Sequence, residues 1–444
     1  MSPQRVLLTG AVAGAAAAVL VPLDRPGLGW PLLALVVFCL VKRVRPGWAT
    51  LSLLLFGTGA VNASTELFPV CVLAGCAAGS LAVVGGRTAR GLAFGSAAAV
   101  VGAGRAMPWL AAELRHSGVR RLSRPVLLTG LVLVVFVPLL AGADAAFAEL
   151  IGSMAPDDSF GPSLFLFALV GLGTVGCLFQ LHHPSAGLDG APTLRRTLAR
   201  RDWAFPVGTL VLVFAVFVGV QIRVLFGGDD YVQRTANLTY AEYARQGFWQ
   251  LLLVTLLALG IVAAIARLAP VETGADRNAL RALLGALSVL TLVIVASALA
   301  RMWSYQQAYG FTVLRIVVAA CELWLGVVFL LVIAAGVKLD GRWLTRAVVG
   351  SGFAALVVLG LVDPDRLTAE GNVARWRETG RIDVAYLARL SDDAVPAIAS
   401  LPADVRRCVL QARTIRPDDW RSWNLARSQA REAVSALPPQ GCAR

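Results

Sequence analysis

The residues of this sequence that could do chemistry gather in three polar stretches that lie between long apolar runs. Arginine and tyrosine together suit the binding of an anionic group, while an acid near them could pair with arginine or carry a proton. We expect these stretches to meet on one aqueous rim of the molecule. The candidate ligand-binding residues are Asp144, Arg223, Tyr240, Glu242, Tyr243, Arg245, Arg301, Tyr305, Tyr309, Arg315 and Glu322.

Two interpretations of this set stay open. The residues could line a pocket for an anionic ligand or a lipid headgroup, or they could form ion pairs and interfacial anchors that close the outer end of a helix bundle. Glu242 also fits a capping box with Thr239. Glu322 lies within an apolar run, where it could relay a proton or a cation or be satisfied by a polar group of a neighbouring helix.

Other chemistries find no support in the sequence. It contains no P-loop, HExxH, GxSxG or catalytic Cys/His pattern, so we expect no cofactor and no ATP-driven or nucleophilic reaction. The adjacent His182 and His183 point in different directions on a helix, and we expect no metal site there. The net charge of +13 comes from short basic clusters between apolar runs, which indicates loops at a lipid surface and no nucleic-acid partner.

Composition sets the elements that must position these residues. The chain of 444 residues is 57% hydrophobic and only 15% charged, whereas a soluble domain has about a quarter charged residues. In lipid, a helix satisfies all of its backbone groups internally. We therefore predict an all-α, polytopic transmembrane helix bundle. Its apolar segments are residues 6–21, 28–41, 48–61, 68–84, 91–110, 126–140, 164–181, 205–225, 248–266, 283–300, 313–337 and 347–362.

Loop charge predicts the orientation. Residues 141–160 contain four acids and no basic residue, while arginines flank this stretch on both sides. Because Lys and Arg are retained in the cytoplasm, the stretch should lie outside, with the N-terminus cytoplasmic and everything after Asp363 extracytoplasmic. This alternation requires about eleven crossings. Segment 91–110, which contains Arg105 and Pro108, is then re-entrant or interfacial.

The same patterns divide the chain into an N-terminal transmembrane region (1–123), a transmembrane core (124–362) and a small C-terminal helical extramembrane domain (363–444). Apolar residues recur at helical spacing in 381–390 and 423–434, which predicts two or three short amphipathic helices in this tail. Cys408 and Cys442 could form a disulfide there if the tail lies in an oxidising space.

Five motifs in order carry a resemblance to a known family. They are LLAGADAAF (139–147), FVGVQIRVLFGG (217–228), LTYAEYARQGFWQL (238–251), SALARMWSYQQAYGFTVLR (297–315) and NVARWRETGRIDVAYLARLSDDAVPAI (372–398). From Val126 onward the chain resembles the bacterial multi-pass membrane family of domain of unknown function 4153/4173. The resemblance implies a multi-pass topology and offers no activity, substrate or catalytic residue to carry over.

These observations lead to a ranked expectation of function. We expect a non-enzymatic envelope component of the bacterial plasma membrane that presents its helical tail outside, with membrane lipids and an envelope protein as partners. The first alternative is a transporter or lipid-handling protein with an anionic-ligand pocket on its outer face. The second is a membrane enzyme on a lipid-linked substrate, with Asp144 and Glu242 as acid or base.

Overall fold

A computed structural model of the chain describes residues 2–114, 160–184, 198–236, 240–269, 272–339, 341–410 and 413–436, with scattered residues between 129 and 144. For residues 111–114, 224–236, 240–247 and 338 it describes the backbone alone. Every regular element in these ranges is a helix. The predicted segment 126–140 lies largely outside them, and each of the other predicted apolar segments is helical.

Seven of the described helical stretches are long and apolar enough to cross a membrane, which is the signature of an integral membrane protein. They are Pro3–Leu20, Gly161–His182, Arg200–Arg223, Phe248–Leu268, Gly274–Tyr309, Val313–Val337 and Leu344–Val362. Three shorter apolar helices are Gly29–Val41, Pro46–Val61 and Leu67–Val83. The count of about eleven crossings stays a prediction.

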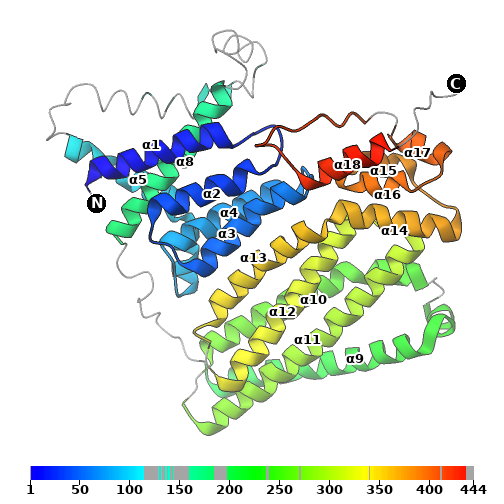
Figure 1. Cartoon of the computed structure of the whole chain (residues 1–444). Helices are drawn as coiled ribbons and strands as arrows, with labels where there is room; N and C mark the ends of the chain where they lie inside the picture. The colour runs from blue at the N-terminus through cyan, green and yellow to red at the C-terminus, as the bar shows by residue number, and fades with distance from the viewer. Residues whose placement is uncertain are drawn as a thin grey trace. The chain divides into compact units, whose positions relative to one another are not determined.

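The chain forms two compact units, each continued by a part of the C-terminal tail. Unit 1 comprises residues 1–190 and 415–429, and unit 2 comprises residues 191–414 and 430–444. The helices of unit 1 are α1 (Pro3–Leu20), α2 (Gly29–Val41), α3 (Pro46–Val61), α4 (Leu67–Val83), α5 (Ala89–Leu114) and α8 (Phe160–His182) (Figure 1).

Small residues set the helix contacts of unit 1. A Cβ atom at Gly10 of α1 would lie 2.5 Å from the side chain of Val175 in α8, and one at Gly14 would lie 2.4 Å from the carbonyl oxygen of Phe167. Glycine at these positions lets the two backbones approach closely, which is how helices associate where lipid removes the hydrophobic drive.

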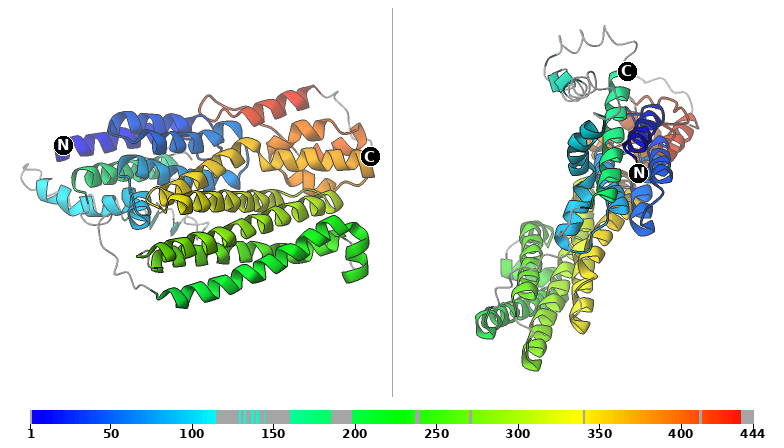
Figure 2. Two further views of the ribbon diagram at one scale, coloured as in Figure 1. Left: turned by 90° about the horizontal axis from the view of Figure 1, so that it is seen from below. Right: turned by 90° about the vertical axis from the view of Figure 1, so that its left-hand side faces the viewer.

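Unit 2 begins with five long helices, α9 (Arg200–Ala236), α10 (Tyr240–Leu268), α11 (Gly274–Tyr309), α12 (Val313–Lys338) and α13 (Leu344–Val362). They run alongside one another from green α9 to yellow-orange α13 (Figure 2). Helix α11 packs against α9, α10 and α12, so it is the central helix of the unit.

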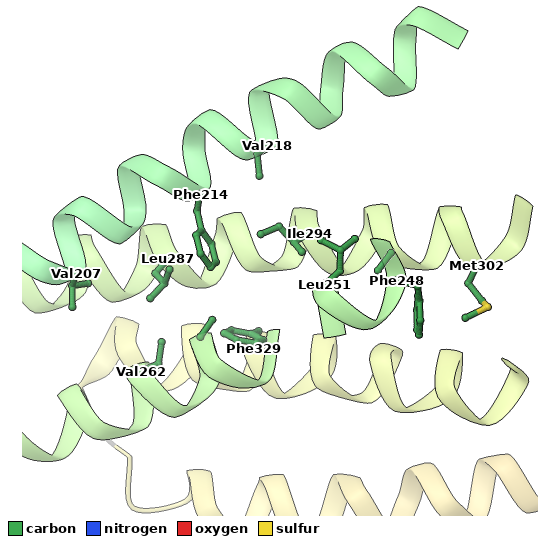
Figure 3. Close-up of a cluster of buried hydrophobic side chains, with 12 residues drawn as sticks. Val207, Phe214, Val218, Phe248, Leu251, Val262, Leu287, Ile294, Met302 and Phe329 are labelled. Carbon is green, nitrogen blue, oxygen red and sulfur yellow. The ribbon is translucent and has the colours of Figure 1, made fainter. Parts of the chain in front are cut away.

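The core of unit 2 is made by large apolar side chains from four of these helices. Phe214 of α9, Leu287 and Ile294 of α11 and Phe329 of α12 point into one shared space (Figure 3). Phe329 and Leu287 are fully buried. These contacts hold the helices that carry the polar residues of the candidate site.

Two polar stretches between the predicted apolar segments, 226–247 and 301–312, are largely helical where the structure describes them. Residues 228–236 continue α9, α10 begins at Tyr240, and α11 continues to Tyr309, so Arg301 and Tyr305 lie on a helix. We had expected each helix to end where its apolar run ends. A helix keeps its backbone hydrogen bonds internal beyond the apolar section, so its polar continuation extends the same helix.

The described part of the tail is helical, as predicted, but it forms six short elements where two or three were expected. They are α14 (Pro364–Thr379), α15 (Val384–Arg389), η1 (Asp392–Ala394), α16 (Val395–Ala399), α17 (Ala403–Leu410) and α18 (Leu425–Ser435). Val373, Leu387, Ile398 and Leu401 form a core of their own in the unit 2 part of the tail. The predicted amphipathic stretches 381–390 and 423–434 correspond to α15 and α18.

Candidate functional site

The predicted site residues are divided between the two units. Asp144 is exposed and belongs to unit 1, while the others belong to unit 2. Arg223 is exposed on α9, and Tyr309 is exposed at the end of α11. Tyr240, Glu242, Tyr243 and Arg245 lie on α10, but their side chains lie outside the described part of the chain, as does the expected cap residue Thr239.

Arg315 and Tyr305 form one contact at the α11–α12 turn. The guanidinium carbon of Arg315 lies 4.3 Å from the centroid of the Tyr305 ring, and its Nη2 donates to the Tyr305 hydroxyl at 3.3 Å. Its Nη1 donates to the carbonyl oxygen of Gly310 at 2.5 Å. The turn is therefore closed by a cation–π contact and a main-chain hydrogen bond.

Arg301 lies in the interior of unit 2. Only 7% of its surface is exposed, and its Nη2 donates to Oε1 of Gln221 on α9 at 2.5 Å. The Ser297 hydroxyl donates to the same oxygen at 3.2 Å. A buried guanidinium is thus met by polar atoms of an adjacent helix, as an ionisable group at bilayer depth requires.

Glu322 is the most deeply buried acid among the candidates, with no exposed surface. Oε1 of its carboxyl group lies 3.2 Å from the hydroxyl oxygen of Thr255 on α10. The other carboxyl oxygen, Oε2, has no hydrogen-bond partner among the described residues. Among the candidates whose side chains the structure describes, Glu322 is the one with a buried polar atom that lacks a partner.

Arg301 and Glu322 lie at similar depth below the α11–α12 turn. Arg301 precedes the last residue of α11, Tyr309, by eight residues, and Glu322 follows the first residue of α12, Val313, by nine. At a rise of about 1.5 Å per residue, each lies about 12–14 Å from its end of the turn. The two helices therefore carry their polar groups in one layer, well inside the apolar part of the bundle.

The tail is fixed to the α11–α12 turn by Asn372. Its side-chain oxygen accepts from the backbone N–H of Phe311 at 3.0 Å, and its amide donates to the carbonyl oxygen of Phe311 at 2.8 Å. Gly371 makes room for this contact, because a Cβ atom there would lie 2.7 Å from the Phe311 ring. One asparagine thus holds both main-chain groups of one residue in the turn.

Two further side chains strengthen this attachment. Arg375 donates to the carbonyl oxygens of Gln307 and Ala308 at 3.1 and 2.8 Å, where α11 ends and its carbonyl groups lack helical partners. The hydroxyl of Tyr386 accepts from the backbone N–H of Val313 at 3.0 Å, where α12 begins. The tail therefore caps the end of one helix and the start of the next.

A cluster of buried acids lies where α13 meets the tail. Asp363, Asp365 and Asp393 are each at most 7% exposed. Burial, a hydrogen bond with the Asp393 carboxyl and the charge of that carboxyl raise the pKa of Asp363 to about 9. Within the described ranges no three His, Cys, Asp or Glu side chains gather as metal ligands do. The surroundings of Asp363 therefore favour its protonated form at this helix junction.

Sequence reasoning missed a second attachment, made within unit 1 by the segment 415–429. The buried amide of Asn424 donates to the carbonyl oxygens of Gly59 and Asn62 at 2.8 and 2.9 Å, where α3 ends. The backbone N–H of Gly29, at the start of α2, donates to the carbonyl oxygen of Arg421 at 2.9 Å. The segment thus caps two helix ends.

An ion pair anchors this segment. The carboxylate of Asp418 is fully buried, and its Oδ1 lies 2.9 Å from Nε of Arg427 and 3.8 Å from Nη1 of Arg25. Gly27 allows the close approach, since a Cβ atom there would lie 2.5 Å from the carbonyl oxygen of Arg421. The run of aromatic and charged residues around Trp420 was the sequence feature that could have indicated this attachment. Its partners could not be inferred, because they lie about 400 residues away in sequence.

The predicted disulfide is not decided by these contacts. Cys408 is exposed on α17 with a free thiol, and Cys442 lies outside the described residues. The pairing stays a prediction.

A family model described as "Domain of unknown function (DUF4153)" matches residues 50–401. The match confirms the resemblance and extends it, because it begins well before Val126 and so includes α4 and α5. It ends at Leu401, after α16. No curated protein and no solved structure matches the chain.

Proposed function

Because the chain belongs to the family of the domain of unknown function DUF4153, whose description specifies no activity, we propose a function from its own geometry. The protein is a non-enzymatic component of the bacterial plasma membrane. It presents a helical tail in a fixed position on the extracytoplasmic side, where a protein of the cell envelope binds it.

The observation that carries this proposal is the attachment of the tail to the α11–α12 turn. Asn372, Arg375 and Tyr386 all bind main-chain groups of this turn. Hydrogen bonds to main-chain atoms fix a position more strictly than contacts between flexible side chains do. A tail held in this way suits a rigid binding surface better than a flexible tether.

The packing of α5 supports the proposed orientation. Its partners in α4 and α8 lie near the ends of those helices: the Ser80 hydroxyl donates to the carbonyl oxygen of Gly95 at 2.6 Å, and Trp109 packs on Phe179 and His183. Helix α5 therefore stays near one end of unit 1, the end that also carries the basic loop residues of 42–45. This favours the interfacial assignment of segment 91–110 and the alternation that places the tail outside.

Two of the four arginines named as candidates for binding an anion are engaged with the protein itself. Arg301 binds Gln221, and Arg315 binds Tyr305 and Gly310. These contacts favour the interpretation in which the polar residues close the bundle over the one in which they form an anionic-ligand pocket. The buried Glu322 is the observation that favours the transporter alternative.

The native Cys408 provides a test of the tail's location. A membrane-impermeant maleimide is added to intact cells before and after reduction, with the double variant Cys408→Ser/Cys442→Ser as the control. The other exposed cysteines, Cys39, Cys76 and Cys321, lie on apolar helices where a water-soluble reagent does not penetrate. We expect labelling of intact cells, and a requirement for reduction if Cys408 is paired with Cys442. Labelling that needs permeabilised cells would place the tail in the cytoplasm and refute the proposal.

The fixed position of the tail is tested with external protease on the same cells. We expect the wild-type tail to resist cleavage and the tail of Arg375→Ala to be cut, because this change removes two hydrogen bonds to the end of α11. Equal cleavage of both proteins would show that the tail is not held by these contacts. Glu378→Ala, an exposed change on the same helix, is the matched control.

A further inference from the structure

We propose that Glu322 is a proton-binding site inside the membrane bundle, a neutral carboxylic acid that donates to the Thr255 hydroxyl and exchanges its proton with water. The inference does not depend on the role of the tail. It rests on the position of the carboxyl group, on its hydrogen-bond geometry and on the charges that surround it.

The position of Glu322 removes it from water. Its side chain has no exposed surface, and it lies on the same face of α12 as Phe329, seven residues and about two helical turns away. Thr255 lies between Leu251 and Ala258 on α10, both of which belong to the buried apolar cluster around Phe329. An ionised carboxylate in such surroundings is strongly disfavoured unless a cation pairs with it.

The hydrogen bonds fit the neutral acid. The Thr255 hydroxyl has one proton and two neighbouring acceptors, the carbonyl oxygen of Leu251 at 3.0 Å and Oε1 of Glu322 at 3.2 Å. If the hydroxyl donates to the closer carbonyl, its oxygen is free to accept from a protonated Glu322. The proton of the acid then completes a chain from the carboxyl group through Thr255 to the backbone.

The surrounding charges do not stabilise the anion. The helices in contact with α12 are α10, α11, α13 and α14. Arg301 of α11 lies at similar depth but donates to Gln221, and within the described residues the polar contact of the Glu322 carboxyl group is with Thr255. Arg267 of α10 and Arg346 of α13 lie toward helix ends, and the charged side chains of α14 belong to the tail. Arg315 of α12 donates to the carbonyl oxygen of Gly310 in the α11–α12 turn.

The unpartnered oxygen indicates that the carboxyl group does more than hold two helices together. A glutamine could donate to Thr255 equally well, so what glutamate adds at this position is an exchangeable proton. Oε2 is buried and has no partner within the described residues. It offers an acceptor for a water molecule or hydronium ion that delivers or removes the proton.

Infrared difference spectroscopy of the purified full-length protein tests the proposal. A protonated carboxyl group gives a C=O stretching band that a carboxylate lacks, and the band shifts when the acidic proton is replaced by deuterium. We expect such a band at neutral pH in the difference between the wild-type protein and Glu322→Gln, which cancels the band of the protonated Asp363, and we expect this band to shift on transfer to D2O. In Thr255→Val the band should move to higher frequency because the hydrogen bond is lost.

Two results would overturn the proposal. Absence of the band shows that Glu322 is ionised, and a band that is insensitive to D2O in the folded protein shows a purely structural acid.

A second measurement works on the wild-type protein alone, so it does not depend on a variant's folding. The O–H of a protonated acid adds across a C=N bond of dicyclohexylcarbodiimide, and the product rearranges to a stable N-acylurea without a leaving group. We expect this adduct on the peptide that contains Glu322, with a yield that falls as pH rises, and its absence at every pH would equally refute the proposal.

Discussion

Replacing Asp363 with asparagine should stabilise the tail at neutral and alkaline pH. The wild-type carboxyl group is buried beside Asp393, and its pKa rises from 3.8 to about 9 in the folded protein. Its Oδ1 accepts from the backbone N–H groups of Asp365 and Arg366, so it also caps α14. Asparagine keeps this cap and tolerates the positive φ of 62° at this position, but it has no charge to bury.

The sign of the pH dependence follows from linkage. Between pH 4 and pH 9 the unfolded chain has lost this proton while the folded chain keeps it, so the free energy of unfolding falls as pH rises. The slope for one proton is about 1.4 kcal/mol per pH unit, which gives a loss of about 3 kcal/mol between pH 6 and pH 8. This stability is fully present below pH 4 and is lost by about pH 9.

The assay is hydrogen exchange of the backbone amides of α14, measured by mass spectrometry from pH 6 to pH 8 and corrected for the intrinsic rates. Wild-type α14 should open more readily at higher pH, and the dependence should be much weaker in Asp363→Asn. Asp383→Asn is the matched control, because Asp383 caps α15 in the same way but is exposed. A wild-type stability that increases with pH, or an Asp363→Asn variant that is less stable at pH 8, would refute the reasoning.

Three further changes test the packing. Asn372→Ala leaves the main-chain groups of Phe311 without their partners, so we expect the free energy of unfolding of the tail to fall by about 1–3 kcal/mol and the Phe311 amide to exchange faster. Unchanged exchange would contradict the attachment of the tail to the α11–α12 turn. Asn424→Ala should lower the free energy of unfolding of unit 1 by a similar amount and release the end of α3, which limited proteolysis would detect. A protected α3 would argue against the cap. Phe329→Ala removes a fully buried ring, so thermal unfolding should report a loss of about 3–5 kcal/mol, while Phe329→Leu should lose much less.

Local sequence patterns predicted the helices well but not their ends. Apolar runs located the membrane helices, and helical spacing located α15 and α18. The continuation of α9 and α11 beyond the apolar run was missed, because hydropathy reports where lipid begins and not where a helix stops. Glu322 could be singled out from the sequence because an acid inside an apolar run is conspicuous.

The partners of the site residues could not be predicted, because they are far apart in sequence. Gln221 meets Arg301 across 80 positions, and Thr255 meets Glu322 across 67. Neutral polar residues such as these occur throughout the chain, and only the packing of α9, α10, α11 and α12 selects the ones that matter. The pocket interpretation of the arginine-rich rim stayed open in the sequence because the internal acceptors of these arginines, including the carbonyl oxygen of Gly310, leave no mark there.

The caps supplied by Asn424 and its neighbours have a consequence for biosynthesis. The helices that they complete are among the first to leave the ribosome, whereas residues 415–429 are among the last to be translated. During insertion, the carbonyl groups at the end of α3 must be satisfied by water or by the insertion machinery. A nascent chain truncated before residue 415 should therefore leave these helix ends exposed to quality-control proteases, although all of its membrane helices have already been made.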